Sequence, residues 1–218
     1  MPSGFPPGIS ITRLHLDRHR LDEVARVATE AFCDDPFFTF LMPSPSMRRR
    51  GLRIFFRSVV ASSRRVATVY GARGNDGALV GVAAFIGPDG LPLPFAAQAS
   101  QLGSAVRALI PRPRAIADGS RYLLATEKAH PHERMWYLQL LAVDPDRQRG
   151  GIGGALQDRV YPDVDGEGLD CYLETQKEDN LAYYRRFGYE VEAELHPVRK
   201  GPPLWTMRRL PRGPADPH

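Results

Sequence analysis

The chain has 218 residues with a net charge of +4 and only two cysteines, so it can bury a hydrophobic core without disulfides. So few cysteines are typical of a reducing compartment, and the first residues lack the basic and apolar stretches of a signal peptide, so we expect a cytoplasmic protein. No apolar run approaches the roughly 20 residues that a membrane helix requires, which excludes a membrane-spanning function.

The N-terminal part predicts a strand and two helices. Residues 9–14 alternate apolar and polar side chains, as a half-buried strand does. Residues 21–31 repeat apolar side chains at helical spacing, and Asp34-Asp35-Pro36 ends that helix. A window over residues 48–65 holds seven arginines around an apolar stripe, which predicts an amphipathic helix with a solvated basic face. The alternative is an acidic or phosphorylated partner for this face, but we do not expect nucleic acid.

Two strands and two helices follow. The strands cover residues 67–71 and 78–86, and the Asn, Asp and Gly residues between them predict a hairpin turn. Residues 87–94 are rich in Pro and Gly and predict a connector. Helices are predicted over residues 95–110 and 114–128, with a proline break between them.

In the second half of the chain, strands alternate with helices. The predicted elements are a strand over 135–143, a helix over 151–160, a strand over 169–174, a helix over 180–187, and strands over 190–196 and 204–210. This alternation predicts an α/β or α+β sandwich with some parallel pairing. Residues 211–218 predict a loose tail.

The strongest chemical signal lies in residues 136–156. A buried strand runs into a turn stiffened by Pro145, and then into a glycine-rich helix start. The first N–H groups of a helix have no partner within it, and the helix dipole adds positive charge, so this segment predicts an anion cradle. Arg147 and Arg149 add formal charge to it.

Two other nucleotide motifs do not fit this segment. A dinucleotide turn reads G-x-G-x-x-G near the first strand of a βαβ unit, whereas here the spacing is Gln148-x-x-Gly151-x-Gly153 and comes late in the chain. A P-loop requires Lys-Ser or Lys-Thr after its last glycine, and Gly154-Ala155 stands there instead.

The Gln148-x-x-Gly151-x-Gly153 pattern resembles the cofactor signature of the GNAT superfamily of N-acetyltransferases. A second block, Cys171 to Thr175 followed by Asn180 to Tyr189, is similar to that family's L-E-T strand end and N-x-x-F/Y-Y helix. Within the superfamily, the last third to two-fifths of the chain is most similar to the puromycin N-acetyltransferase group, through features that run from Trp136 to Met207.

The resemblance implies an α+β fold with a mixed, mostly antiparallel central sheet of about six to seven strands, a splayed parallel pair and flanking helices. It implies acetyl-CoA as co-substrate and no metal. The cofactor-binding residues that it implies are Leu141, Ala142, Val143, Gln148, Arg149, Gly150, Gly151, Ile152, Gly153, Gly154, Asn180 and Tyr184. One of the N–H groups of Leu141 to Val143 would polarise the thioester carbonyl.

The resemblance also implies two catalytic residues. Tyr184 matches the family's general acid, the alternative being a core tyrosine. Many family members carry glutamate where this chain has Gln139, and an amide cannot accept a proton, so Glu174 is our candidate base; a cap or an ion pair is the alternative for it. The family usually has glycine in place of Arg149, so contacts to the pyrophosphate are expected to be rearranged there. Asn180 is expected both to cap its helix and to lie near the pantetheine.

His130-Pro131-His132 superficially suggests a metal site, but no third ligand follows at a suitable spacing, and we expect an exposed loop.

The expected function is transfer of an acetyl group to a primary amine of a small molecule, such as an antibiotic or a metabolite. The alternatives are a peptide or protein N-acetyltransferase and a non-catalytic acyl-CoA-binding module. We expect one domain over residues 1–210, with the acceptor side over about 1–130 and the acetyl-CoA side over about 135–210. The sequence does not decide the oligomeric state, and a homodimer formed through edge strands is one alternative.

Overall fold

The computed structural model describes residues 8–92, 95–109 and 112–213, and its core is a seven-stranded sheet in the order β1-β2-β3-β4-β5-β7-β6. The strands are β1 (Ser10–Arg13), β2 (Ala67–Arg73), β3 (Leu79–Ile86), β4 (Trp136–Val143), β5 (Cys171–Thr175), β6 (Tyr189–Leu195) and β7 (Leu204–Arg209). Neighbouring strands are antiparallel except β4 and β5, which are parallel. This topology confirms the predicted fold class.

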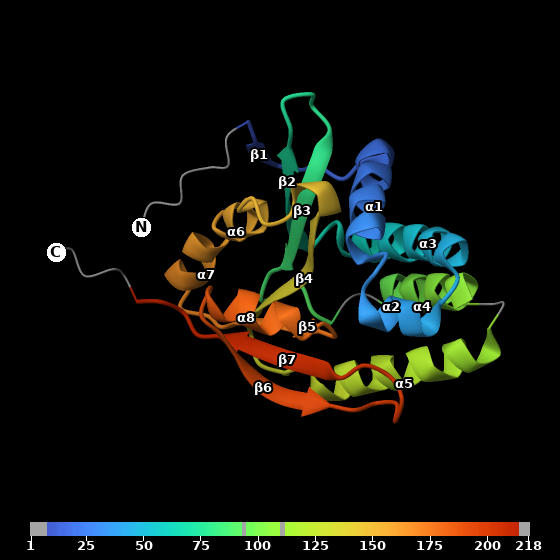
Figure 1. Cartoon of the computed structure of the whole chain (residues 1–218). Coiled ribbons are helices and arrows are strands. Elements are labelled where there is room, and N and C mark those ends of the chain that lie inside the picture. The colour runs from blue at the N-terminus through green and yellow to red at the C-terminus, as the bar shows by residue number, and fades with distance from the viewer. Residues whose placement is uncertain (1–7, 93–94, 110–111, 214–218) are drawn as a thin grey trace.

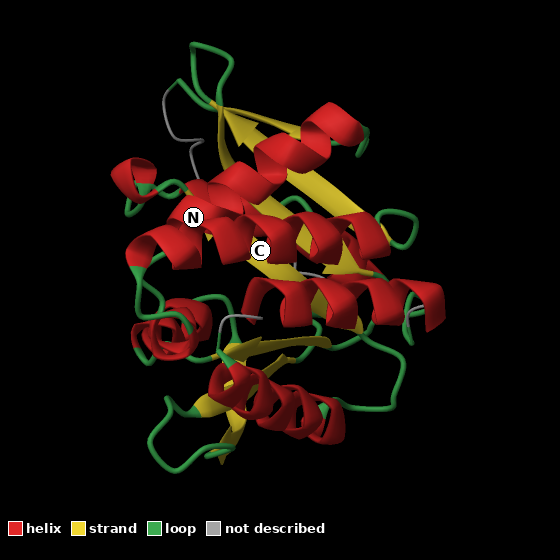
Figure 2. Ribbon diagram, turned by 90° about the vertical axis from the view of Figure 1, so that its right-hand side faces the viewer, coloured by secondary structure: helices red, strands yellow, loops and turns green. Residues whose placement is uncertain are grey.

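Helices cover both faces of the sheet. They are α1 (Arg18–Phe32), α2 (Pro36–Leu41), α3 (Pro45–Ser63), α4 (Phe95–Leu109), α5 (Pro113–Ala129), α6 (Ile152–Gln157), α7 (Tyr161–Gly166) and α8 (Asp179–Arg185), with a 3-10 turn, η1, at Pro145–Arg147. Figure 1 shows α6, α7 and α8 on one side of the sheet and α1 to α5 on the other. Figure 2 looks onto the second side, where the helices lie across the strands.

Each face of the sheet has its own hydrophobic core. One core packs the apolar stripes of α1 and α3 against β2, β3 and β4, and the other packs α6, α7 and α8 against β3, β4, β5 and β7. In α1, Leu21, Val24, Val27 and Ala28 are 4% exposed or less, and Ala31 is partly buried against the same core, which confirms the predicted helical stripe. The predicted helices over 95–110 and 114–128 are confirmed as α4 and α5, although residues 110–111 lie outside the described part.

Pro36 does more than end α1. The structure begins a further short helix, α2, at this residue, and the sequence did not predict it. The side chain of Asp35 accepts a hydrogen bond from the Phe37 N–H at 2.9 Å, and proline is favoured in the first helical turn, so the same residues end one helix and start the next.

Arg48 lies in the basic window but not on the predicted solvated face, which Arg50, Arg53, Arg57 and Arg64 share. Its side chain is 6% exposed, and its guanidinium donates to the carbonyls of Cys33, Met42 (2.8 Å) and Pro43 (3.1 Å). Arg48 therefore fastens α3 to the turns that flank α2. Its role is structural.

The predicted helix over residues 151–160 is shorter in the structure, where α6 covers Ile152–Gln157, and a second helix that the sequence did not predict, α7, follows it. α6 ends at Gln157, and α7 begins at Tyr161 with Pro162 in its first turn. The prediction missed this break because Val160 continues the apolar stripe of α6 and is fully buried, which gives no local sign of a helix end.

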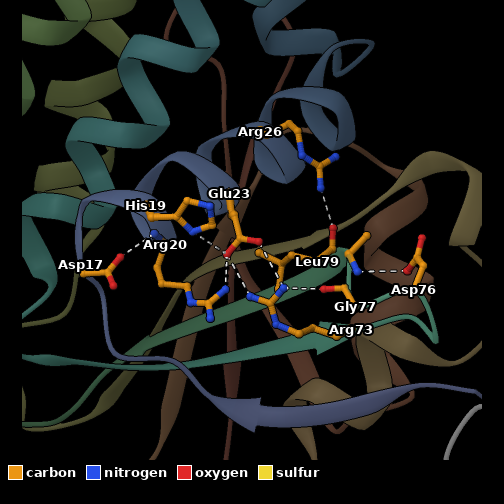
Figure 3. Close-up of polar contacts among 10 residues, drawn as sticks. Asp17, His19, Arg20, Glu23, Arg26, Arg73, Asp76, Gly77 and Leu79 are labelled. Atoms are coloured by element: carbon orange, nitrogen blue, oxygen red, sulfur yellow. Dashed lines mark hydrogen bonds and ion pairs between the residues drawn. The ribbon is translucent and has the colours of Figure 1, made fainter.

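An ion-pair cluster joins α1 to the β2–β3 hairpin, as Figure 3 shows. Glu23 accepts hydrogen bonds from Arg73 at 2.9 Å and from Arg20 at 2.6 Å, and Arg26 donates to the Leu79 carbonyl at 2.7 Å. These contacts fix the first helix to β2 and β3, on the far side of β4 from β5.

The C-terminal segment is only partly loose. The Arg212 N–H donates to the Asp165 carboxylate at 2.9 Å, so the predicted tail is anchored at this point. Residues 214–218 of that tail, like residues 1–7, lie outside the described residues. Within the described ranges, none of the helices combines the length and apolar character that a membrane crossing needs.

Candidate active site

A β-bulge at Gln139 sets the geometry of β4. The pairing with β3 runs Phe85 to Leu138 and then Ala84 to Leu140, so Gln139 is the extra residue. Before the bulge, Leu138 packs in the core on the α6–α8 side; after it, Leu140 packs in the core on the opposite side. Strict alternation would keep these two side chains on one face, so the bulge exchanges the two faces of the strand.

Beside the bulge, β4 and β5 separate. Their parallel pairing consists of Trp136 with Cys171 and Tyr137 with Tyr172, and it ends there. The rest of β4 stays paired with β3, while the rest of β5 stays paired with β7. A gap therefore opens inside the sheet between Leu138–Val143 and Leu173–Thr175.

The gap is lined by backbone groups of β4. The Asp144 N–H donates to the Val80 carbonyl of β3 at 2.8 Å, and peptide groups alternate in direction along a strand. The N–H groups of Leu141 and Val143 therefore point away from β3 and toward the gap. The side-chain amide of Gln148 donates to the Val143 carbonyl at 3.0 Å, on this same side of the strand.

The glycine-rich loop follows directly and has an unusual backbone. Arg149 has a φ of 63°, and among the described residues it is the one non-glycine residue with positive φ; Gly151 has a φ of 82°. This left-handed region favours glycine, and a strained arginine is characteristic of a binding loop. The first hydrogen bond of α6 runs from the Ala155 N–H to the Gly151 carbonyl, so the four N–H groups from Gly151 to Gly154 lie ahead of the helical ladder.

Gly153 brings α6 and α8 together. A Cβ atom on this residue would lie 2.6 Å from the hydroxyl oxygen of Tyr183. That hydroxyl accepts a hydrogen bond from buried Gln157 at 2.8 Å. The absence of a side chain at Gly153 therefore allows α6 and α8 to pack closely, and the same residue also lies in the predicted anion-binding loop.

Asn180 lies in the first turn of α8, where the N-cap is Glu178, so the prediction that Asn180 caps this helix is wrong. Its side-chain amide instead donates to the Thr175 hydroxyl at 2.9 Å, which ties α8 to the end of β5 and to the mouth of the gap.

Tyr184 packs in the core on the α6–α8 side, next to Tyr189, with ring centroids 5.7 Å apart. Burial, and secondly the neighbouring Tyr183, raise the pKa of its hydroxyl. A raised pKa keeps a phenol protonated, which is the state that a proton donor needs.

Glu174 lies across the gap, within a cluster of aromatic residues on the α5 side. Its side chain is 7% exposed, and its Oε1 atom lies 3.4 Å from Nδ1 of His130. The His130 ring contacts the rings of Tyr137 and Tyr172 edge-on, with centroids 5.1 and 5.0 Å away. Burial and then the Glu174 charge raise the pKa of the Tyr137 and Tyr172 hydroxyls, so both stay protonated beside the carboxylate.

His130 was missed as a site residue. The expected exposed loop is wrong for this position, because the side chain is only 22% exposed and contacts Glu174. One feature of the sequence could have indicated this position. The helix that becomes α5 ends at residue 129, so His130 is the first residue after the helix and comes shortly before a strand. Within the described part of the chain, no group of three or more potential metal ligands occurs.

Many of the predicted cofactor-binding residues border the gap. The β4 backbone, the loop from Gln148 to Gly154, and Asn180 border it, whereas Tyr184 and Glu174 belong to opposite faces of the sheet. Gln139 is held by the Ser63 hydroxyl, which donates to its side-chain oxygen at 2.7 Å.

Comparison with known proteins identifies this arrangement as the GNAT fold. Residues 117–191 match the family described as acetyltransferase (GNAT) domain. A Corynebacterium glutamicum protein described as histone acetyltransferase HPA2 and related acetyltransferase is 22% identical, with a TM-score of 0.67 and coverage of 95% of this chain and 99% of that one.

Two further solved structures share the fold. The paia N-acetyltransferase of Thermoplasma acidophilum, in complex with coenzyme A, is 15% identical, with a TM-score of 0.53 and coverage of 92% of this chain and 99% of that one. Arylalkylamine N-acetyltransferase 2 of Aedes aegypti is 12% identical, with a TM-score of 0.59 and coverage of 93% and 100%. The narrower resemblance to the puromycin N-acetyltransferase group stays a prediction.

Proposed function

We propose that this chain is an N-acetyltransferase that transfers an acetyl group from acetyl-CoA directly to a primary amine of a small molecule. The observation that carries this proposal is the gap between β4 and β5, lined by the outward N–H groups of Leu141 and Val143 and ending at a glycine-rich loop. The match of residues 117–191 to the GNAT domain supports it.

The residues present fit acetyl-CoA. The unpaired β4 backbone offers hydrogen bonds to the amide groups of an extended pantetheine arm, in the manner of an added strand. The N–H groups from Gly151 to Gly154, with Arg147 and Arg149, offer donors and positive charge to a pyrophosphate. Asn180 borders the same gap through Thr175.

When bound, acetyl-CoA supplies the acetyl group as a thioester. The N–H of Leu141 or Val143 would stabilise the negative charge that develops on the carbonyl oxygen, and losing one such donor costs about 3–4 kcal/mol in other enzymes. Glu174, assisted by His130, would take the proton that the amine releases as its C–N bond forms. Tyr184 would hold the proton that the sulfur takes when the C–S bond breaks.

We further propose that residues 1–210 act as a single N-acetyltransferase domain. Residues up to about 130 would shape the acceptor side, and residues from about 135 would bind acetyl-CoA. The peptide or protein alternative is represented among the relatives by the protein described as a histone acetyltransferase. If the chain were instead a non-catalytic acyl-CoA-binding module, acetyl-CoA would bind in the gap but no acetyl transfer would be measured.

Two measurements on the purified chain test this function. Calorimetry with acetyl-CoA and with CoA is expected to give heat of binding, and a thiol-release assay is expected to show turnover with an amine. Arg149→Gln is expected to weaken CoA binding severalfold, because it removes one charge at the phosphate loop. The matched control is Arg50→Gln, on an exposed position of α3.

The outcomes separate the alternatives. Absence of binding by either CoA compound would refute the proposal. Binding without thiol release across a panel of amines, polyamines and peptides would favour an acyl-CoA-binding module instead.

A further inference from the structure

An apolar cavity of about 220 Å³ lies between α2, α3, α4 and α5. Aromatic rings from three of these helices form part of its wall: Phe37 and Phe38 of α2, Phe55 of α3 and Tyr122 of α5. Among the described residues that line the cavity, none is charged, and the polar ones are Ser120, Thr126, Gln176 and Tyr122. Figure 1 shows α2, α4 and α5 beside one another on the side of the sheet opposite α6.

The outer end of the cavity is open to solvent. Leu102, Val106 and Leu123 line it although they are 50%, 37% and 51% exposed. Large apolar side chains on a surface are uninformative singly, but three around one opening indicate a binding site.

Two lining residues of the cavity connect it along the chain to the Glu174 cluster. Gln176, a lining residue, comes two positions after Glu174 on the chain that leaves β5. Thr126, another lining residue, accepts a hydrogen bond at its carbonyl from the His130 N–H at 2.8 Å. These two connections are the reason to direct the amine of a molecule in the cavity toward the carboxylate and histidine that we propose to handle it.

We infer that the cavity holds the body of the acceptor, and that the acceptor is a primary amine with one apolar group of about the size of an aromatic ring on a short arm. This inference rests on the proposed function and names its substrate class. An apolar cavity of about 150 Å³ holds benzene, so one of this size accommodates a ring together with a short alkyl arm.

The charges agree with this class of acceptor. Glu174 offers a carboxylate, and the rings of Tyr137 and Tyr172 stand beside it, which suits a single ammonium group. The uncharged wall disfavours an acceptor with several amines, because a second ammonium inside it would be desolvated without a partner. Polyamines and aminoglycosides are therefore expected to be poor substrates.

The acceptor preference is tested with amines of graded apolar size. With saturating acetyl-CoA, kcat/KM for 2-phenylethylamine is expected to exceed that for ethanolamine and for putrescine by about 100-fold, because the ring buries apolar surface that the others lack. A preference for putrescine, or for a peptide over 2-phenylethylamine, would overturn the inference.

Two neighbouring leucines supply a matched pair of variants. Leu123 lines the cavity, whereas Leu124 is 63% exposed and does not line it. Leu123→Asp is expected to raise KM for 2-phenylethylamine at least tenfold and to leave acetyl-CoA binding unchanged. Leu124→Asp is expected to change neither. Val106→Ser is the second variant, should Leu123→Asp fail to fold.

A readout without turnover keeps this inference distinct from the proposed function. Calorimetry with 2-phenylethanol, which has no amine, is expected to show binding to the wild-type chain and loss of binding in Leu123→Asp. If acetyl-CoA bound but 2-phenylethanol did not, the inference about the acceptor would be overturned and the proposed function would stand. If 2-phenylethanol bound but acetyl-CoA did not, the proposed acetyltransferase function would be overturned. Dissociation of a dimer by Leu123→Asp, seen by ultracentrifugation, would assign the patch to a second copy and also overturn it.

Discussion

The protonation states of two side chains on opposite faces of the sheet decide what the gap can do. Tyr184 is buried in the core on one face, and burial raises the pKa of its hydroxyl, so it remains a proton donor up to at least about pH 10. Glu174 is on the other face, where the Tyr137 and Tyr172 hydroxyls and His130 surround its carboxylate. An acid and a base separated in this way can act on opposite sides of one reacting group.

We predict that Tyr184→Phe lowers kcat by about 10- to 100-fold and leaves the Kd for CoA unchanged. General acids contribute about 10²- to 10⁴-fold in enzymes, and a thiol with a pKa of about 8.5 leaves fairly well unaided, which places the effect at or below the lower end of that range. Thiol release and calorimetry measure the two quantities.

Tyr183→Phe is the matched control on the same helix. Its hydroxyl bonds Gln157 and packs against Gly153, so removing it is expected to cost about 1 kcal/mol of stability without the loss of kcat. Equal kcat for Tyr184→Phe and the wild type would remove Tyr184 from the mechanism.

At the scale of elements, α1 is held to the β2–β3 hairpin by charge as well as by its apolar stripe. Hydrogen bonds from Arg73, and further ones from Arg20, lower the pKa of Glu23 to about 2 (Figure 3). A carboxylate whose pKa falls on folding stabilises the folded state above its unfolded pKa of about 4.5, and this stabilisation is lost as the pH falls toward 2.

Glu23→Gln is therefore expected to lower the free energy of unfolding by about 2 kcal/mol at pH 7, and by much less at pH 2.5. Urea unfolding at the two pH values measures the difference between the variant and the wild type. Glu30→Gln, on the same helix, is the control: Glu30 and its partner Arg49 are 40% and 57% exposed, so the expected loss is below about 1 kcal/mol. A Glu23→Gln deficit that did not shrink in acid would contradict this reasoning.

At the scale of the whole molecule, one arginine joins the separate segments of the C-terminal half. Arg209 of β7, with a side chain only 2% exposed, bonds the Asp165 carboxylate of α7 at 2.7 and 2.9 Å. It also donates to the Phe187 carbonyl at 3.1 Å, ahead of β6, and lies 4.3 Å from the Tyr161 ring centroid. These bonds hold α7 and the β6–β7 hairpin in place. β5 stays paired with β7 of this hairpin where β5 separates from β4.

Asp165→Asn is predicted to destabilise the fold by about 3 kcal/mol, because it leaves a buried guanidinium without its counter-charge. Asp118→Asn, in the surface pair with Arg121 within α5, is the control and should cost less than about 0.5 kcal/mol. The denaturant midpoints of the two variants measure their losses of stability. Equal losses would show that the burial of Arg209 does not make the loss of its counter-charge more costly.

Local sequence by itself determined the elements and the loop at the cofactor side. Strand alternation, helical stripes and turn residues act through contacts within a few residues, so β4, α8 and the glycine turn at Gly151 were predictable. The N-cap at Glu178 and the break after Gln157 were missed because neighbouring residues continue the helical pattern at both points.

Only the tertiary structure decided the gap and the acceptor side. The bulge at Gln139 depends on the register with β3, and the contact of His130 with Glu174 joins residues 44 apart in sequence. The apolar cavity requires four helices packed together. Such contacts are set by the packing of distant segments against one sheet, which no local propensity encodes, and they include the features that select the acceptor.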